Sequence, residues 1–296
     1  MGRLDGRVAI VTGASRGLGK AIAMKLAAEG AAVAVVARTE QVWDERLPGT
    51  IGETVAQIEA AGGRAVAVRA DLLERADRAR LVEEARAALG PITILVNNAA
   101  FTAPGRPPKP GAEAGARERR APAATGATAT ANLSRSDWPT FLTTPLGAYE
   151  RHFVIGPFAS YELMQLVVPD MVAAGRGAIV NVTSGASRMP GDGPYPDRSE
   201  GVLAGYGGAK AALEHLTQCT AYDLADSNIA VNALSPSKAI LTPGVAYYSK
   251  DFEDLAPEED FAEAAVRLLT VDPTVITGRV VGHLDVLDGS FRPYSR

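Results

Sequence analysis

Short runs of apolar residues alternate along the chain with longer segments rich in Ala and Leu. Runs such as VAIV and AIVNV have few polar positions, which is typical of strands that helices cover on both faces. We expect strands at 7–11, 33–37, 64–69, 92–96, 178–183, 229–234 and 279–281. We expect helices at 17–29, 50–61, 74–88, 146–174, 206–225 and 257–269. This alternation predicts an α/β fold, a doubly wound parallel β-sheet with helices on both faces.

One segment departs from this pattern. Residues 102–131 hold ten Ala, five Pro and four Gly but no Ile, Leu, Val or aromatic residue, so they bring too little apolar surface to offset the entropy lost on ordering. We therefore expect a single domain over residues 1–296 with a flexible Ala/Pro/Gly-rich insertion at 102–136. A mobile surface loop is the simpler interpretation, and contact of its basic residues with a phosphate is the alternative.

Composition excludes several classes of protein. With 47% apolar residues the chain can build a large core, which rules out global disorder. Thirty Lys and Arg against 34 Asp and Glu give a net charge of −4, which argues against nucleic acid or an acidic membrane as a partner. One cysteine and three scattered histidines predict no disulfide and no metal site. Because we find no signal peptide and no apolar span, we expect a cytoplasmic protein.

The segment 12–19 reads TGASRGLG and joins the first predicted strand to the first predicted helix. Glycines at such a turn let the main chain approach a pyrophosphate, which the free amides and the positive end of the helix dipole bind. The spacing GxxxGxG is a variant of the dinucleotide-binding turn. A turn that serves packing alone is the alternative interpretation.

Tyr206 and Lys210 lie at i and i+4 in YGGAK, on one face of a predicted helix. An ammonium beside a phenol favours the phenolate, so we expect Lys210 to lower the pKa of Tyr206 and make it a usable proton donor or acceptor near neutral pH. Ser184 follows the strand 178–183, at the sheet edge where α/β proteins bind ligands. Its hydroxyl would hold a substrate oxygen or, alternatively, only shape a turn.

Taken together and in this order, the motifs resemble the short-chain dehydrogenase/reductase family. They are TGASRGLG at 12–19, Asp71-Leu72 after the third strand, NNAA at 97–100, IVNVTS ending at Ser184, and YGGAK at 206–210. The resemblance covers the chain except for residues 102–136. It implies a single Rossmann-type domain that uses NAD(H) or NADP(H) to interconvert a carbonyl and an alcohol by hydride transfer.

The resemblance also assigns roles to individual residues. Tyr206 would be the acid/base, Ser184 would orient and stabilise the carbonyl or alcohol, and Lys210 would bind the ribose hydroxyls. The residues expected to bind the cofactor are Gly13, Ser15, Arg16, Gly17, Leu18, Gly19, Arg38, Asp71, Leu72, Asn98, Ala99, Ala100, Tyr206, Lys210, Pro236, Ser237 and Thr242. The family further implies a small-molecule carbonyl or alcohol substrate and a homodimer or homotetramer.

The choice between the two cofactors depends on the end of the second strand. In VAVVAR, Ala37 stands where an acid would accept hydrogen bonds from a ribose 2′-OH, and Arg38 follows at once. Arg16 adds a second cation on the same side. We therefore expect NADP(H) to be preferred, with NAD(H) possible; a solvent-exposed Arg38 without a ligand is the alternative.

The chain also departs from the family. Alignment on Gly156-Pro157-Phe158 puts Phe153 where the family has an asparagine that holds a water beside the lysine, and His152 is the only nearby substitute. In the simpler interpretation His152 faces solvent or the insertion. A short deletion that shifts the helix register, so that no residue substitutes directly, is the alternative. Ser184 and Tyr206 are 22 positions apart, which predicts an elaborated substrate loop. Two other functions stay open: a catalytically impaired sensor or scaffold, which Phe153 favours, and an enoyl or imine reductase.

Overall fold

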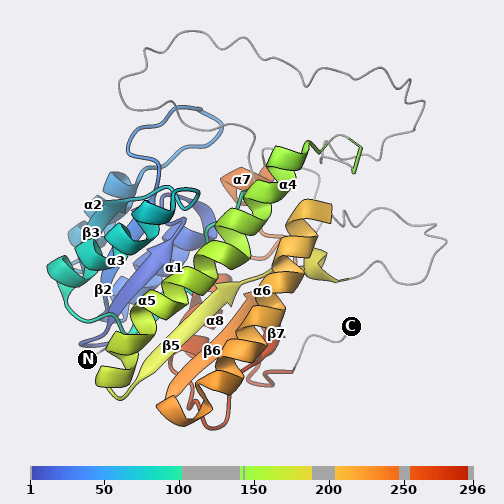
Figure 1. The fold of residues 1–296 in the computed structure, drawn as a ribbon. Helices are drawn as coiled ribbons and strands as arrows, with labels where there is room; N and C mark the ends of the chain where they lie inside the picture. The colour runs from blue at the N-terminus through green and yellow to red at the C-terminus, as the bar shows by residue number, and fades with distance from the viewer. Residues whose placement is uncertain (1, 102–140, 143, 189–203, 247–253, 293–296) are drawn as a thin grey trace.

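Seven parallel strands form one sheet in the order β3-β2-β1-β4-β5-β6-β7 in the computed structural model (Figure 1). The structure describes residues 2–101, 141–142, 144–188, 204–246 and 254–292. The predicted fold class, a Rossmann-type doubly wound parallel sheet, is confirmed. The strands are β1 (Val8–Thr12), β2 (Ala32–Ala37), β3 (Arg64–Arg69), β4 (Ile94–Asn97), β5 (Gly177–Val182), β6 (Ile229–Ser235) and β7 (Val280–Gly282).

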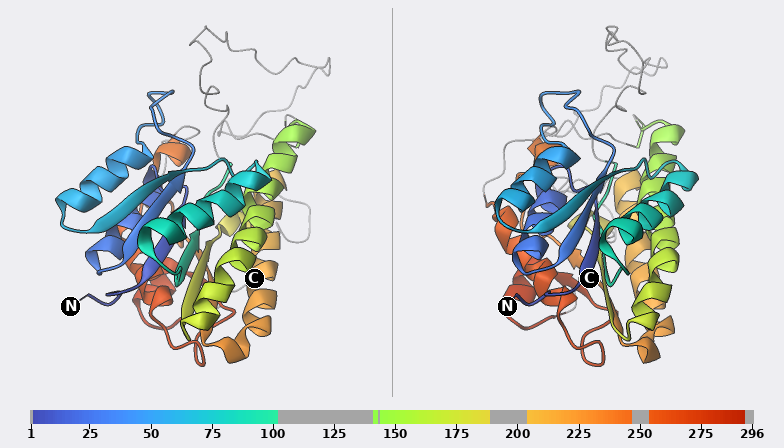
Figure 2. Two further views of the ribbon diagram at one scale, coloured as in Figure 1. Left: turned by 60° about the vertical axis from the view of Figure 1, so that its left-hand side comes forward. Right: turned by 90° about the vertical axis from the view of Figure 1, so that its left-hand side faces the viewer.

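Helices cover both faces of this sheet (Figure 2). One face packs against α1, α2 and α8, and the other against α3, α5 and α6. The helices are α1 (Gly17–Ala28), α2 (Ile51–Ala60), α3 (Arg75–Leu89), α4 (Leu146–Phe153), α5 (Ala159–Ala173), α6 (Ala204–Asp223), α7 (Pro243–Ala246), α8 (Glu258–Leu269) and α9 (His283–Leu287).

The apolar runs of the strands supply both layers of the core. In β1, Ala9 and Val11 belong to one buried cluster, whereas Val8 and Ile10 belong to the other. Successive side chains of a strand point to opposite faces, so a strand between two helical layers needs an apolar residue at nearly every position. This requirement explains the uninterrupted runs in the sequence.

The strand order reverses at β1, which pairs with β2 on one side and with β4 on the other. Connections leave in opposite directions at such a point, and the carboxyl ends of the strands border a crevice where α/β proteins bind ligands. The Gly-rich turn after β1 and the segments that follow β4, β5 and β6 all lie at this edge.

The predicted continuous helix 146–174 is wrong. It is divided into α4 and α5 by a π-helical turn, Val154–Phe158, in which Gly156 has ψ −105°. Pro157 explains the break, because proline has no N–H to give to the carbonyl of Phe153 and its ring clashes with a regular helical turn. The break lies where α4 and α6 pack together, next to the candidate site.

The other predicted elements agree with the observed ones to within a few residues. The short helices α7 and α9 were not predicted. The predicted insertion at 102–136 and most of the segment between Ser184 and Tyr206 lie outside the described residues. In the part of the chain that is described, no helix is long and apolar enough to cross a membrane.

Candidate active site

The turn after β1 is packed closely against its neighbours at its glycines. Gly13 (φ +68°) is so close to the segment after β4 that a Cβ would lie 2.9 Å from Cα of Ala99. A Cβ at Gly19 would lie 2.4 Å from the carbonyl oxygen of Gly13. Gly17 (φ +53°) faces Thr242, whose Cβ would be 3.2 Å away from an added methyl group. The glycines therefore form a narrow backbone cradle at the N-terminus of α1, which fits a pyrophosphate.

Asn98 holds this cradle against the end of β4. Its side-chain amide donates to the carbonyl oxygens of Thr12 (2.9 Å) and Gly13 (3.3 Å). The hydroxyl of Thr12 in turn accepts from the amides of Asn98 (3.0 Å) and Ala99 (3.1 Å). Asn98 was expected to line the cofactor, and in the structure its side chain fixes the walls of the site.

Two cations lie beside the cradle. Arg16 donates through Nη2 to the hydroxyl of Thr39 (3.2 Å) and to the carbonyl oxygen of Gly49 (3.1 Å), while its buried Nε has no partner. Burial lowers the pKa of Arg16, and the neighbouring charge of Arg38 lowers it further. Two like charges and an unpaired buried donor at one place fit an anionic ligand.

Asp71 and Leu72, at the end of β3, are buried beside this region. The carboxylate of Asp71 lies 3.9 Å from Arg38 and accepts a hydrogen bond from the amide of Leu73 at 3.1 Å. The structure therefore places both residues at the edge of the sheet next to Arg38, where the adenosine end of a dinucleotide would lie.

Ser184, Tyr206 and Lys210 come together at the end of β5, as the motifs predicted. Ser184 caps a short 3₁₀ turn and accepts from the amide of Ala186 at 3.3 Å. It also forms a hydrogen bond with Tyr206. Burial raises the pKa of Tyr206, and this hydrogen bond opposes the rise only in part. The expectation that Lys210 lowers the pKa of Tyr206 is therefore not met in the protein alone.

Lys210 is almost fully buried, with 4% of its surface exposed. Its Nζ donates to the carbonyl oxygen of Val182 at 2.6 Å and lies 5.5 Å from the centre of the Tyr206 ring. Burial lowers the pKa of Lys210 to about 8, and the negative charge of Glu214 acts in the opposite direction. Near neutral pH the site thus pairs a neutral phenol with an ammonium.

His152 is half-buried, and the insertion, which the simpler interpretation gave as its other possible neighbour, lies outside the described residues. Its ring stands edge-on to Tyr206, with centroids 6.0 Å apart, and to Phe101 at 5.1 Å. Nδ1 is buried without a partner, and burial together with the charge of Lys210 lowers the pKa of His152 to about 4. Phe153 packs instead near Gly208, where an added Cβ would lie 3.6 Å from Cζ of the ring.

Sequence reasoning missed the histidine that holds the loop after β6. His283 is fully buried, and its Nδ1 accepts from the amide of Ser237 at 2.8 Å. The hydroxyl of Ser237 accepts from the amide of Leu284 at 3.2 Å. This loop, which begins at Pro236, carries Thr242 to the Gly-rich turn. No sequence signal pairs His283 with Ser237, because 46 positions separate them.

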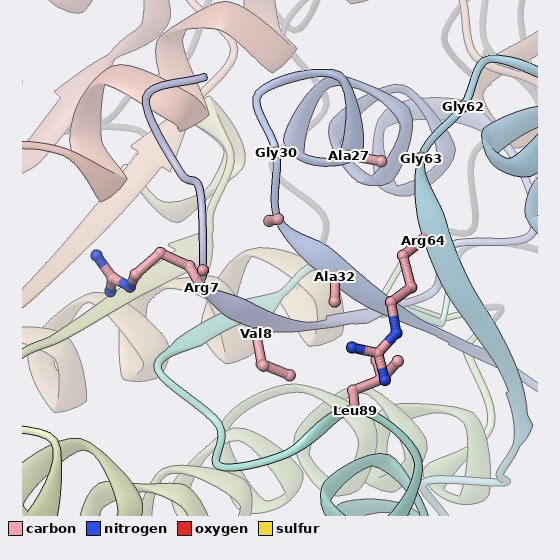
Figure 3. A pocket seen from close by; sticks show the side chains of 11 residues that line it. Arg7, Val8, Ala27, Gly30, Ala32, Gly62, Gly63, Arg64 and Leu89 are labelled. Atoms are coloured by element: carbon pink, nitrogen blue, oxygen red, sulfur yellow. The ribbon is translucent and has the colours of Figure 1, made fainter. Parts of the chain in front are cut away.

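A cavity of about 370 Å³ lies at the other end of the sheet, near the amino ends of β1, β2 and β3 (Figure 3). Its two arginines already have partners: Arg7 donates to the carbonyl oxygen of Thr93 and Arg64 to that of Ala88, both at 2.8 Å. These bonds tie both arginines to the carbonyl ends of neighbouring segments, and we assign the cavity no role in the reaction.

Residues 7–251 of this chain match the family model of the short chain dehydrogenases. The chain is a short-chain dehydrogenase/reductase. As a member of this family it is an NAD(P)-dependent oxidoreductase that acts on CH–OH groups, with a nucleotide cofactor and a small-molecule substrate.

Known members of the short-chain dehydrogenase/reductase family match over nearly the whole chain. A 7alpha-hydroxysteroid dehydrogenase of Escherichia coli (strain K12) is 28% identical over 289 residues, covering 94% of this chain and 93% of the relative. A solved 7 alpha-hydroxysteroid dehydrogenase, complexed with NADH and 7-oxo glycochenodeoxycholic acid, has a TM-score of 0.70 at 27% identity and covers 95% and 93%. A protein of Beutenbergia cavernae described as an NAD(P)-dependent gluconate 5-dehydrogenase, with bound NADP, has a TM-score of 0.68 at 27% identity and covers 96% and 98%.

Proposed function

We propose that the chain interconverts a ketone and a secondary alcohol, with Tyr206 as the acid/base, Ser184 as the orienting hydroxyl and Lys210 as the cation that binds the ribose. One observation carries the proposal: these three side chains meet at the end of β5, next to a glycine cradle that fits a dinucleotide. The same cradle, with Asp71 and Thr242 at its sides, would hold the cofactor.

The bound nicotinamide supplies or accepts the hydride. In the direction of reduction, Tyr206 donates its phenolic proton to the carbonyl oxygen, which suits a phenol whose pKa burial has raised. The hydroxyl of Ser184 donates to the same oxygen and orients the carbonyl. Lys210, held by Val182, places its positive charge beside the phenolate that forms. Because Lys210 is buried, its charge acts in a medium of low dielectric, which strengthens its effect on the phenolate.

The preferred cofactor is NADP(H). Arg16 and Arg38 stand together at the end of β2, and Ala37 leaves the ribose position without a carboxylate. The buried and unpaired Nε of Arg16 supports an anionic group such as a 2′-phosphate. Asp44, which acts on Arg16, already binds Arg46 at 2.7 Å, so its charge is largely neutralised.

The substrate class that we propose is bulky and apolar, with hydroxysteroids as the first candidates. A hydroxysteroid dehydrogenase stands among the full-length relatives as well as among the solved structures. We also propose one domain, a homodimer or homotetramer, and a cytoplasmic location, all of which follow from the family and the composition. Light scattering of the purified protein measures the assembly.

Two measurements test the function. NADPH oxidation is followed with a panel of ketosteroids and smaller ketones, and the best substrate is repeated with NADH. We expect turnover with at least one ketone and a ratio of kcat/KM that favours NADPH. Tight NADPH binding without turnover on any member of the panel would support the sensor or scaffold function instead. Reduction of enones at the carbon–carbon double bond would support an enoyl reductase.

A further inference from the structure

Three consecutive residues at the end of β5 bind three successive turns of α6. The helix residues of the three pairs stand four positions apart on α6, so the end of β5 is bound to α6 at three successive turns. The pairs are Ser184 with Tyr206, Val182 with Lys210, and Thr183 with Glu214. Two of these pairs involve the proposed site, whereas the third has no assigned function.

The third pair is short and partly buried. Thr183 is a buried residue, 1% exposed, and its hydroxyl donates to Oε1 of Glu214 at 2.5 Å. A hydrogen bond from a buried hydroxyl to a carboxylate is charge-assisted and about twice as strong as a neutral one. Glu214 lies one turn after Lys210 on α6, so the carboxylate and the ammonium share a helix face. Thr183 thus holds a negative charge on the side of Lys210 that faces away from Tyr206.

The surroundings of Lys210 make this charge important. Tyr206 and Glu214 lie on its own helix, and from α4 the neutral imidazole of His152 faces it. The carbonyl oxygen of Val182 is its hydrogen-bond acceptor on β5. Among the described residues, Glu214 is the acidic group that raises the pKa of Lys210 against the effect of burial. Without it, the lysine would lose its proton closer to neutral pH.

We propose that Glu214 is a positioning residue for the reaction: held by Thr183, it keeps α6 in register with β5 and keeps a charged Lys210 beside Tyr206. The inference rests on the proposed roles of Tyr206 and Lys210. Glu214 acts through these two residues and does not touch the substrate. The register places the phenol against Ser184, and the carboxylate maintains the ammonium that the reaction needs.

Two substitutions separate the charge from the hydrogen bond. Glu214→Gln keeps an acceptor for Thr183 but removes the negative charge, so we expect the alkaline limb of the kcat/KM profile to move about one pH unit towards acid.

Thr183→Val keeps the charge but removes the donor, so we expect kcat to fall roughly tenfold at every pH, with a smaller change in the midpoint of the pH profile. Thr183→Ser should restore most of that loss. Asp223→Asn, which also changes a carboxylate on α6, is the matched control and should change neither quantity.

A second readout needs no substrate. NADPH fluorescence gives the Kd between pH 6 and 10, where the charge of Lys210 supports binding of the ribose. We expect the Kd of Glu214→Gln to rise at a lower pH than that of the parent protein. Circular dichroism and thermal melting show whether each variant is folded.

The outcomes distinguish this inference from the proposed function. If Tyr206→Phe abolishes turnover but Glu214→Gln leaves both pH profiles in place, the role of Glu214 is wrong and the site stands. If Tyr206→Phe retains turnover, the proposed function is wrong, and the NADPH-binding profile still decides whether Glu214 controls Lys210. A uniform loss of stability in Glu214→Gln, without any shift of the profiles, would show a structural role only.

Discussion

The two walls of the site are built in opposite ways. On the cofactor wall, glycines leave space, and hydrogen bonds from Asn98 hold the backbone in place. On the substrate wall, side chains from β5 and α6 occupy the space, and burial sets their pKa values. The cofactor wall therefore depends on the lack of Cβ atoms at its glycines, and the substrate wall depends on the polar groups of its side chains. Adding a methyl group should therefore damage one, and removing a hydroxyl the other.

The largest effect is expected at the substrate wall. Tyr206→Phe removes the proton donor, and we expect kcat to fall about 10²- to 10⁴-fold while the Kd for NADPH stays within twofold to threefold of the parent value. Stopped-flow or steady-state assays with the best ketone measure the first quantity, and NADPH fluorescence the second. Substantial residual turnover would assign the proton to another group.

Gly19→Ala tests the cofactor wall. The added Cβ would lie 2.4 Å from the carbonyl oxygen of Gly13, so the turn must open. We expect the Kd for NADPH to rise by at least about tenfold, because displaced amides lose alignment with the phosphates. The matched control is Gly52→Ala on α2, where the nearest atom is 4.0 Å away. Equal affinity in both variants would contradict the backbone cradle.

The cofactor preference is the next test. Arg38→Ala should raise the KM for NADPH about tenfold and leave that for NADH nearly unchanged, because only NADPH carries the 2′-phosphate. Added salt should weaken NADPH binding in the parent protein more than in the variant. An unchanged ratio of the two KM values would remove Arg38 from cofactor selection.

A smaller effect is expected at the helix that precedes the break. Phe153→Asn places an amide where the family has one, and we expect kcat to rise severalfold.

His152→Ala removes the imidazole beside Tyr206, and we expect kcat to fall severalfold, with a changed pH profile. The exposed His215, replaced by Ala, is the control for the second change. If neither variant alters kcat or its pH dependence, α4 plays no part in proton transfer.

The smallest effect lies away from both walls. Arg3 binds Glu29 at 2.6 Å and Glu263 at 2.7 Å, and its hydrogen bonds hold the pKa of each carboxyl at about 2. Depressed pKa values stabilise the fold fully only above the ordinary glutamate pKa of 4.5, and this contribution is lost as the pH falls towards 2. Arg3→Ala should cost ~1 kcal/mol of unfolding free energy at pH 7, because the group is partly exposed. Urea titrations at pH 7 and pH 3 should show the difference shrinking at the lower pH.

The sequence predicted those parts of the site that lie in contiguous motifs. The Gly-rich turn and the Tyr206–Lys210 pair are local, since a few neighbouring residues determine their geometry. The contacts of Thr183 with Glu214 and of Ser237 with His283 span 31 and 46 positions, so tertiary packing alone brings them together. The pKa of Tyr206 was mispredicted for the same reason, because burial is a property of the packed core.

The hydrogen bond between Ser237 and His283 has a consequence for folding during synthesis. Synthesis proceeds from the amino end, and folding during synthesis follows that order. The cradle after β1 and the strand β5 emerge from the ribosome long before His283, which follows Ser237 by 46 positions. Until that histidine has emerged and become buried, the loop that carries Thr242 lacks this anchor. A nascent chain that stops between Thr242 and His283 would therefore carry both sets of motifs but an unfinished binding site.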